Sequence, residues 1–453
     1  MDVTNSSIPS QLKPGPGFFI NRNFIFLWGG QAISGLGDTI FFFTLTLWIA
    51  TVIGKNLSWA PLAISGLMIS MCIPSLVFGP IAGVFVDRWD KRLTMIRMDI
   101  IRAVFIFLLI PFTGWIALPF VKGSLSVFWH LGAIYSVVFV TCICAQLFDP
   151  ARFTILSAIV DEQQRARASG LEQTSQSLAN IVGPILATLL LFAVGVQWAL
   201  IVNALSFVVS FLAIIAVRVP TANKENGADT GQKTSLPQEL GEGLLFYRES
   251  QWMMALFISI LTVTLGTGAL ETLLIFFYKQ NLHAPIDLFG LLAMSIGLGS
   301  FLGALLATFF ASRLGLVRVF CLSLYLVGIL FVLFARQTSL LPALILHFLI
   351  GIPLVTLNVA LSPLLMRIIP QNIMGRVMGV FSTSLTICNL ISMSVAGLLG
   401  TLLAGLHMKV LGITFGIYDT IYVVAGLLFF LSGLYAMINL RDLHTNERLK
   451  KVR

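Results

Sequence analysis

The stretch GPIAGVFVDRWDKRLTMIRMDIIRA, residues 79–103, joins two long apolar runs through a short, strongly basic turn. Gly79 and Gly83 lie four residues apart, so on a helix they share one face and allow another helix to approach closely. Asp87 ends the first run, where a carboxylate can pair with a basic group or cap a neighbouring helix. The basic residues of the turn are Arg88, Lys91 and Arg92. This pattern predicts a chain that crosses an apolar layer repeatedly.

The composition of the whole chain also indicates an apolar environment. Of its 453 residues, 57% are hydrophobic and 10% are charged, and the mean hydropathy is +0.95. Soluble domains contain about 25% charged residues. A soluble fold could not cover this much apolar surface, so we expect an integral membrane protein.

Twelve apolar stretches are long enough to cross a bilayer core of about 30 Å. None shows the alternation of a barrel strand, so the expected fold is all-α, with twelve transmembrane helices in two six-helix bundles related by pseudo-two-fold symmetry. The predicted spans are 24–53, 59–86, 93–119, 128–149, 168–195, 197–218, 251–279, 286–311, 315–335, 340–367, 376–406 and 415–440.

The basic residues fix a predicted orientation. If the N-terminus is cytoplasmic, 23 of the 28 Lys and Arg residues lie on the cytoplasmic side of this map. The positive-inside rule then predicts a multi-pass protein of the cell inner (plasma) membrane with both termini in the cytoplasm. This distribution also explains the net charge of +9 without a nucleic acid.

A long polar interruption divides the map into six and six. We expect a cytoplasmic N-terminal segment, a first bundle, a cytoplasmic linker containing a short amphipathic helix, a second bundle and a cytoplasmic tail; the ranges are 1–22, 23–218, 219–250, 251–440 and 441–453. The sequences of the two halves are weakly similar. When the loop-to-helix segments 158–170 and 367–379 are aligned, Arg167 and Gly170 match Arg376 and Gly379. Such internal repeats are typical of secondary transporters.

The pattern Gly83-x-x-x-Asp87-Arg88-x-x-Lys91-Arg92 resembles the signature loop of the major facilitator superfamily. Together with FLWGGQAISGLGD, NIVGPILATLL and IVNALSFVVSFL, it resembles the drug–proton antiporters that include macrolide efflux pumps, over nearly the whole chain. The resemblance implies a cytoplasmic gate, which we assign to Gly83, Asp87, Arg88, Lys91, Arg92, Asp99 and Arg102. Asp99 and Arg102 share a helix face, and we also expect them to form an ion pair.

Two acids interrupt long apolar runs. Asp38 lies in SGLGDTIFFFTLTLWI, residues 34–49, and Glu271 lies in GTGALETLLIFF of the seventh span. Lipid cannot solvate a carboxylate, so each acid must face a cavity or a partner. We interpret them as mirrored residues that couple proton entry to transport, because a buried carboxyl group can exchange a proton near neutral pH.

Polar and aromatic residues at span depth are candidates for a substrate cavity. We select Gln31, Phe42, Asn180, Phe276, Asn358 and Asn389. Interhelical hydrogen bonding and ordinary packing are the alternative roles. Apolar walls with few polar groups suit small amphiphilic substrates.

The expected function is proton-coupled export of amphiphilic drugs, macrolide-like or multidrug, by alternating access. A siderophore or lysophospholipid transporter of the same fold is the alternative, and a non-transporting receptor or scaffold is a more distant one. We expect no enzyme, catalytic set, metal site or cofactor, and a nucleotide-binding loop is absent. The expected partners are the substrate, protons and membrane lipids, and we expect a monomer that binds no nucleic acid.

Overall fold

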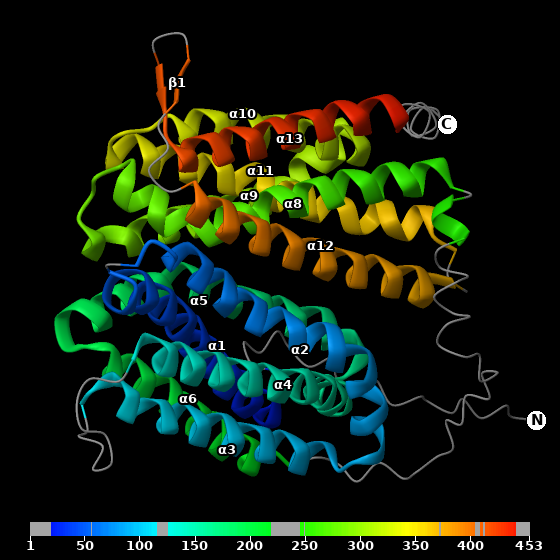
Figure 1. Ribbon diagram of the computed structural model, residues 1–453. Coiled ribbons are helices and arrows are strands. Elements are labelled where there is room, and N and C mark those ends of the chain that lie inside the picture. The colour runs from blue at the N-terminus through cyan, green and yellow to red at the C-terminus, as the bar shows by residue number, and fades with distance from the viewer. Residues whose placement is uncertain are drawn as a thin grey trace, which may run out of the picture.

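The computed structural model describes residues 20–55, 57–115, 126–218, 245–248, 250–370, 373–403, 408–410 and 413–440. Within these ranges the chain forms twelve long helices and one short hairpin (Figure 1). The helices of the first half are α1 (Arg22–Trp48), α2 (Ala60–Arg88), α3 (Lys91–Leu109), α4 (Val127–Ile159), α5 (Arg165–Leu189) and α6 (Val196–Ala216). Those of the second half are α8 (Gln251–Gln280), α9 (Phe289–Leu314), α10 (Leu316–Ala335), α11 (Leu340–Ile368), α12 (Met374–Leu402) and α13 (Ile417–Asn439).

Local sequence signals begin and end several of these helices. The side chains of Asn21, Asp90 and Ser250 accept hydrogen bonds from backbone N–H groups in the first turns of α1, α3 and α8. Gly315, with φ of 87°, makes the tight turn between α9 and α10. Only glycine adopts that conformation without strain, so α9 ends there and α10 returns beside it.

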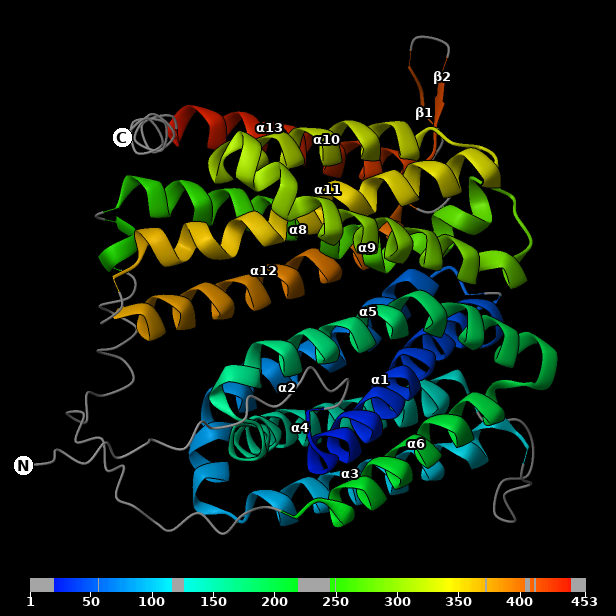
Figure 2. The same ribbon diagram turned by 180° about the vertical axis from the view of Figure 1, so that it is seen from behind.

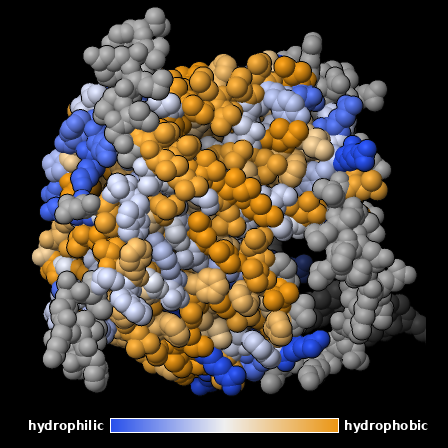
Figure 3. All heavy atoms as spheres, in the orientation of Figure 1, coloured by the Kyte–Doolittle hydropathy of each residue, from blue (hydrophilic) through white to orange (hydrophobic). Residues whose placement is uncertain are grey.

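The helices have the length and composition of membrane spans. In the described part of the chain, eleven helices are long and apolar enough to cross a bilayer. α3 is the twelfth long helix, and its charged residues, among them Arg97, Asp99 and Arg102, lower its hydropathy. Figure 3 shows hydrophobic residues over most of the helical face, with hydrophilic residues toward its edges. The chain is therefore a multi-pass membrane protein.

The two halves repeat the same packing. In the first half α1 packs on α5 and α6, α4 packs on α2 and α3, and α3 packs on α6. The second half has the equivalent pairs: α8 with α12 and α13, α11 with α9 and α10, and α10 with α13. The expected two six-helix bundles with pseudo-two-fold symmetry are confirmed, and both views show them as separate layers (Figures 1 and 2).

The bundles touch mainly at one end. The strands β1 (Met408–Val410) and β2 (Ile413–Phe415) pair antiparallel between α12 and α13, and we call their side of the molecule the hairpin end. The opposite side, where α1 begins and α13 ends, is the terminal end. The main contacts between bundles join α2 to α12 and α5 to α9.

These inter-bundle contacts lie at the hairpin end. The hydroxyl of Ser65, near the start of α2, donates to the carbonyl of Met393 on α12 over 2.7 Å. A Cβ added to Gly290, near the start of α9, would lie 2.7 Å from the carbonyl oxygen of Pro184 on α5. α2 and α12 diverge from this end toward the terminal end in Figure 1. The structure is thus closed at the hairpin end.

Most predicted spans agree with the helices within a few residues. The clearest difference is α4, which was expected to end at 149 but continues to Ile159, so Arg152 lies in a helix and not in a loop. The hairpin was not expected. Of the predicted linker helix, residues 245–248 form a helical turn in which the Tyr247 hydroxyl donates to the carbonyl of Val377. The rest of the expected linker, the tail 441–453 and residues 1–19 lie outside the described residues.

Candidate functional site

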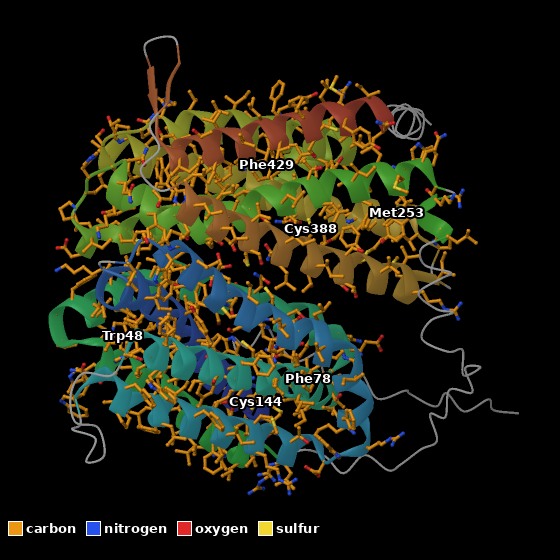
Figure 4. The ribbon with its side chains drawn as sticks, in the orientation of Figure 1. Trp48, Phe78, Cys144, Met253, Cys388 and Phe429 are labelled. Carbon is orange, nitrogen blue, oxygen red and sulfur yellow. The ribbon has the colours of Figure 1, made fainter. Side chains whose placement is uncertain are left out.

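A central cavity of about 890 Å³ lies between the bundles. Its walls come from α1, α2 and α5 on one side and from α8, α9, α10, α11 and α13 on the other. The lining is mainly apolar and aromatic, and its polar members include Asn180, Ser300, His347 and Asn358. Figure 4 shows side chains of both bundles between the two layers, with Trp48 at the hairpin end of α1. A cavity of this size and chemistry fits a drug-sized amphiphile.

Among the described residues, Glu271 is the acidic residue on the wall of this cavity. It lies on α8, lines the cavity and is exposed, although protein surrounds it. Tyr422 of α13 lies within electrostatic reach and donates its hydroxyl to the carbonyl of Leu270, next to the acid. An exposed carboxylate in an otherwise apolar cavity attracts a cationic group.

Asp38 lies on the inner face of α1, between two hollows. Phe42, one turn further, lines the central cavity, whereas Gly35 and Gln31, one and two turns earlier, line a small pocket with Arg152 and Glu172. Asp38 is exposed and interacts electrostatically with Arg102, and Asn203 lies beside it. The acid therefore lies on the face of α1 that lines both hollows, and Arg102, a buried cation, acts on it.

The packing of α1 and α8 shows that the two acids are not exact mirrors. Gly37 packs on Asn203 and Ser206 of α6, and Gly266 packs on Ala425 and Phe429 of α13. Thr39 contacts Gly183 of α5, and Gly268 contacts Ser392 of α12. Both pairs of contacts align α1 with α8 in the same way. This alignment places Thr267 opposite Asp38 and Phe42 opposite Glu271. The expected mirror relation is wrong by one helical turn, about 6 Å along the axis.

Asp99 and Arg102 do not form the expected direct ion pair. Both are buried, and the three ion pairs within 4 Å in the described ranges do not include them. Asp99 accepts a hydrogen bond of 2.6 Å from the Ser210 hydroxyl. The Arg102 guanidinium lies 5.0 Å from the ring centre of Phe148 and 5.3 Å from that of Phe207. The two rings hold the cation by cation–π contact.

The other candidate gate residues lie near the terminal end. Arg92 donates from Nε to the carbonyl of Ile214 over 3.2 Å and from Nη2 to that of Ile215, so it caps the end of α6. Arg88 is exposed and Lys91 is half-buried. The backbone of Gly83 and Asp87 belongs to α2, but the surroundings of Gly83 and the side chain of Asp87 lie outside what the structure describes.

The candidate cavity residues divide into two groups. Phe42, Asn180 and Asn358 line the central cavity, and Asn180 accepts a hydrogen bond from Gln176. Phe276 does not belong to the wall: it is 8% exposed and stacks on Tyr418, because it points toward α13.

Gln31 and Asn389 also lie away from the central cavity. Gln31 lines the small pocket and donates to Ser210, which links this pocket to Asp99. The amide oxygen of Asn389 packs over Gly268. Both side chains therefore serve contacts between helices within one bundle.

Sequence reasoning missed several polar contacts. Arg152 pairs with Glu172 over 3.2 Å and with Asp149 over 3.6 Å. Arg336 pairs with Asp419 over 3.4 Å near the hairpin end. The three-residue spacing of Asp149 and Arg152 could have indicated the first contact, had α4 been extended.

Two equivalent six-helix bundles around a central cavity are the architecture of a membrane transporter. A family model described as Major Facilitator Superfamily matches residues 27–393 and 256–453. The chain belongs to the Major Facilitator Superfamily, whose members are transporters and not enzymes.

Known relatives share about a quarter of the residues. The chain is 25% identical over 386 residues to an uncharacterized MFS-type transporter, YkuC, of Bacillus subtilis, covering 82% of this chain and 85% of the relative. It is 24% identical over 309 residues to macrolide efflux protein A of Streptococcus pyogenes, covering 68% and 71%. It is 26% identical over 300 residues to the putative bacilysin exporter BacE of Bacillus subtilis, covering 66% and 67%.

Solved structures support the fold. The bacterial homologue of the iron transporter ferroportin in its inward-facing state superposes with a TM-score of 0.70 at 16% identity, over 92% of this chain and 98% of that chain. The nucleoside transporter NupG superposes with a TM-score of 0.69 at 14% identity, over 93% and 99%.

Proposed function

We propose that this transporter exports small amphiphilic compounds, cationic ones in particular, in exchange for protons. The observation that carries the proposal is Glu271, an exposed carboxylate on the wall of an otherwise mainly apolar cavity between the bundles. The similarity to macrolide efflux protein A and to a putative bacilysin exporter supports the direction of transport.

The proposed orientation places the terminal end in the cytoplasm of a cell with this protein in its inner membrane. The basic residues of the turns between α2 and α3 and between α9 and α10, among them Lys91 and Arg313, lie at this end. The positive-inside rule favours this arrangement. The structure is then open to the cytoplasm, the state in which an exporter loads its substrate.

In the proposed coupling, Asp38 and Glu271 take up protons while the cavity faces outward. The change between access states costs less with a protonated carboxyl group than with an ionised one, and proton release restores the charge that attracts a cation. Arg102 and Asp99 interact electrostatically with Asp38. We assign closure of the cytoplasmic side to the predicted gate residues around Asp87, Arg88, Lys91 and Arg92.

Proton flux from proteoliposomes tests the function. Purified protein is reconstituted with a pH-sensitive dye inside, and lipophilic cations, a neutral macrolide, a siderophore and a lysophospholipid are added in turn. We expect cations and the macrolide to trigger proton movement. Proton movement with the siderophore or the lysophospholipid alone would favour the alternative substrates. No proton movement with any of the four compounds would favour a receptor or scaffold.

Cysteine labelling tests the orientation. In a background without the native cysteines, a cysteine at position 91 or 313 should react only with reagents that reach the cytoplasm. Labelling of either position by an impermeant reagent from outside would reverse the proposed topology.

A further inference from the structure

His347 on α11 is a buried histidine, 4% exposed, on the wall of the central cavity. Its Nδ1 lies 2.8 Å from the carbonyl oxygen of Leu292 on α9 and 3.2 Å from the hydroxyl of Ser295. A carbonyl oxygen can only accept, and the Ser295 hydroxyl already donates to the same oxygen over 2.7 Å. These contacts assign the hydrogen to Nδ1, so in the neutral ring Nε2 is an acceptor.

The rest of the imidazole ring is held in place but Nε2 is not satisfied. Phe334 of α10 stacks on the ring, with 5.2 Å between ring centres and 26° between planes. Within the described ranges Nε2 has no hydrogen-bond partner. Because His347 lines the cavity, a bound molecule with a donor group can pair with this acceptor.

An aromatic pair connects His347 to Glu271: Tyr422 lines the cavity, and the fully buried Phe334 lies behind the wall. Tyr422 lies within electrostatic reach of Glu271, and its ring centre is 5.8 Å from that of Phe334, which stacks on His347. The anionic and the hydrogen-bond-accepting groups are therefore separated by two aromatic rings. The cavity lining also includes the apolar Leu274, Phe331 and Leu354, so it can bind an apolar body between the two polar contacts.

We propose that His347 binds substrate by accepting, at Nε2, a hydrogen bond from a hydroxyl or N–H group. The preferred substrate class is then an amphiphile with a cationic group at Glu271 and a separate hydrogen-bond donor at His347. This inference rests on the proposed function and specifies its substrate.

Two fluorescent cations distinguish the donor contact from simple cation binding. Rhodamine 6G carries secondary amines with N–H donors, whereas tetramethylrhodamine ethyl ester shares its ring system and ester but has tertiary amines. His347→Asn keeps a donor for the Leu292 carbonyl and removes the Nε2 acceptor. His347→Gln brings an amide oxygen close to the position of Nε2.

Fluorescence polarisation in detergent measures the binding of each dye. In His347→Asn we expect about tenfold weaker binding of rhodamine 6G, the value of one hydrogen bond of about 1.4 kcal/mol, and an unchanged affinity for the ester. His347→Gln should recover most of the lost affinity. Equal weakening of both dyes, or of neither, would overturn the role of His347. A wild-type protein that binds neither dye would contradict the proposed function as well.

Discussion

At the scale of single residues, the two acids have different surroundings although both are exposed. Asp38 interacts with Arg102 behind it and lies between the small pocket and the central cavity. Glu271 has an aromatic neighbour, Tyr422, and no cation acts on it within the described residues. We therefore expect Asp38 to serve proton coupling alone, whereas Glu271 also binds the cationic group.

Substitution of each acid should separate these roles. Asp38→Asn should leave a folded protein that binds neutral substrate but no longer accumulates it against a gradient, because the exchangeable proton site is lost. Glu271→Gln should weaken binding of a cation about tenfold and leave a neutral compound unaffected. Substrate-induced proton release in detergent and pH-driven transport in liposomes check both variants. Wild-type behaviour of Asp38→Asn in both assays would exclude the coupling role.

Arg102 should stabilise the fold because it compensates the charge of the buried Asp99. Arg102→Met leaves the buried Asp99 without its nearby cation, and we expect a loss of about 1–3 kcal/mol in the free energy of unfolding. Thermal unfolding in detergent measures the loss. The double variant Arg102→Met with Asp99→Asn is the matched control, and it should recover a large part of the stability. A double variant as unstable as the single one would show that the phenyl contacts matter more than the charge.

At the scale of elements, α9 and α11 approach so closely that backbone meets backbone. A Cβ added to Gly299 would lie 1.9 Å from the carbonyl oxygen of Phe348, and one added to Gly303 would lie 2.4 Å from that of Ile352. From the other side, a Cβ on Gly351 would lie 2.4 Å from the carbonyl oxygen of Ile296. This spacing of small residues positions the His347 face of α11 against the cavity.

Gly299→Ala should therefore destabilise the second bundle by about 1–3 kcal/mol, because the helices must separate to admit a methyl group. The control is Gly132→Ala on α4, where an added Cβ has no neighbour within 4 Å. Thermal unfolding of both purified variants compares them directly. A Gly299→Ala protein as stable as Gly132→Ala would mean that α9 and α11 are further apart than described.

The elements could be predicted from sequence because hydropathy and charge are local properties. Residues that line the cavity were harder to select, since one face of a helix is defined only by its neighbours. Phe276 and Phe42 look alike in sequence, but the first packs on Tyr418 and the second faces the cavity. His347 could not be selected from the sequence, because the carbonyl group that fixes its ring, that of Leu292, belongs to another helix.

At the scale of the whole molecule, closure depends on a few contacts at the hairpin end. Ser65 bonds to α12, and Gly290 packs against Pro184. Nearby, a Cβ on Gly400 would lie 3.2 Å from the Cβ of Pro61. Transport by alternating access requires these contacts to break in each cycle.

A disulfide between Pro61→Cys and Gly400→Cys, in a background without native cysteines, should trap the protein in this state. The Cβ separation is slightly below the range of about 3.5–4.5 Å for disulfides, so a small relaxation suffices. Transport in liposomes should stop on oxidation and return on reduction, whereas each single-cysteine variant should be insensitive to oxidant. Continued transport by the fully cross-linked protein would show that the hairpin end need not open.

The matching helix pairs of the two bundles have an evolutionary consequence. The contact of α2 with α12 and that of α5 with α9 exchange with one another under the pseudo-two-fold axis, as the two halves of a symmetric interface would. An ancestral six-helix chain could thus have functioned as a homodimer before gene duplication and fusion. In such a dimer both copies would hold the same residue at each depth. The acids at Asp38 and Glu271, one turn apart in register, then record divergence after the fusion, when each half acquired a separate task.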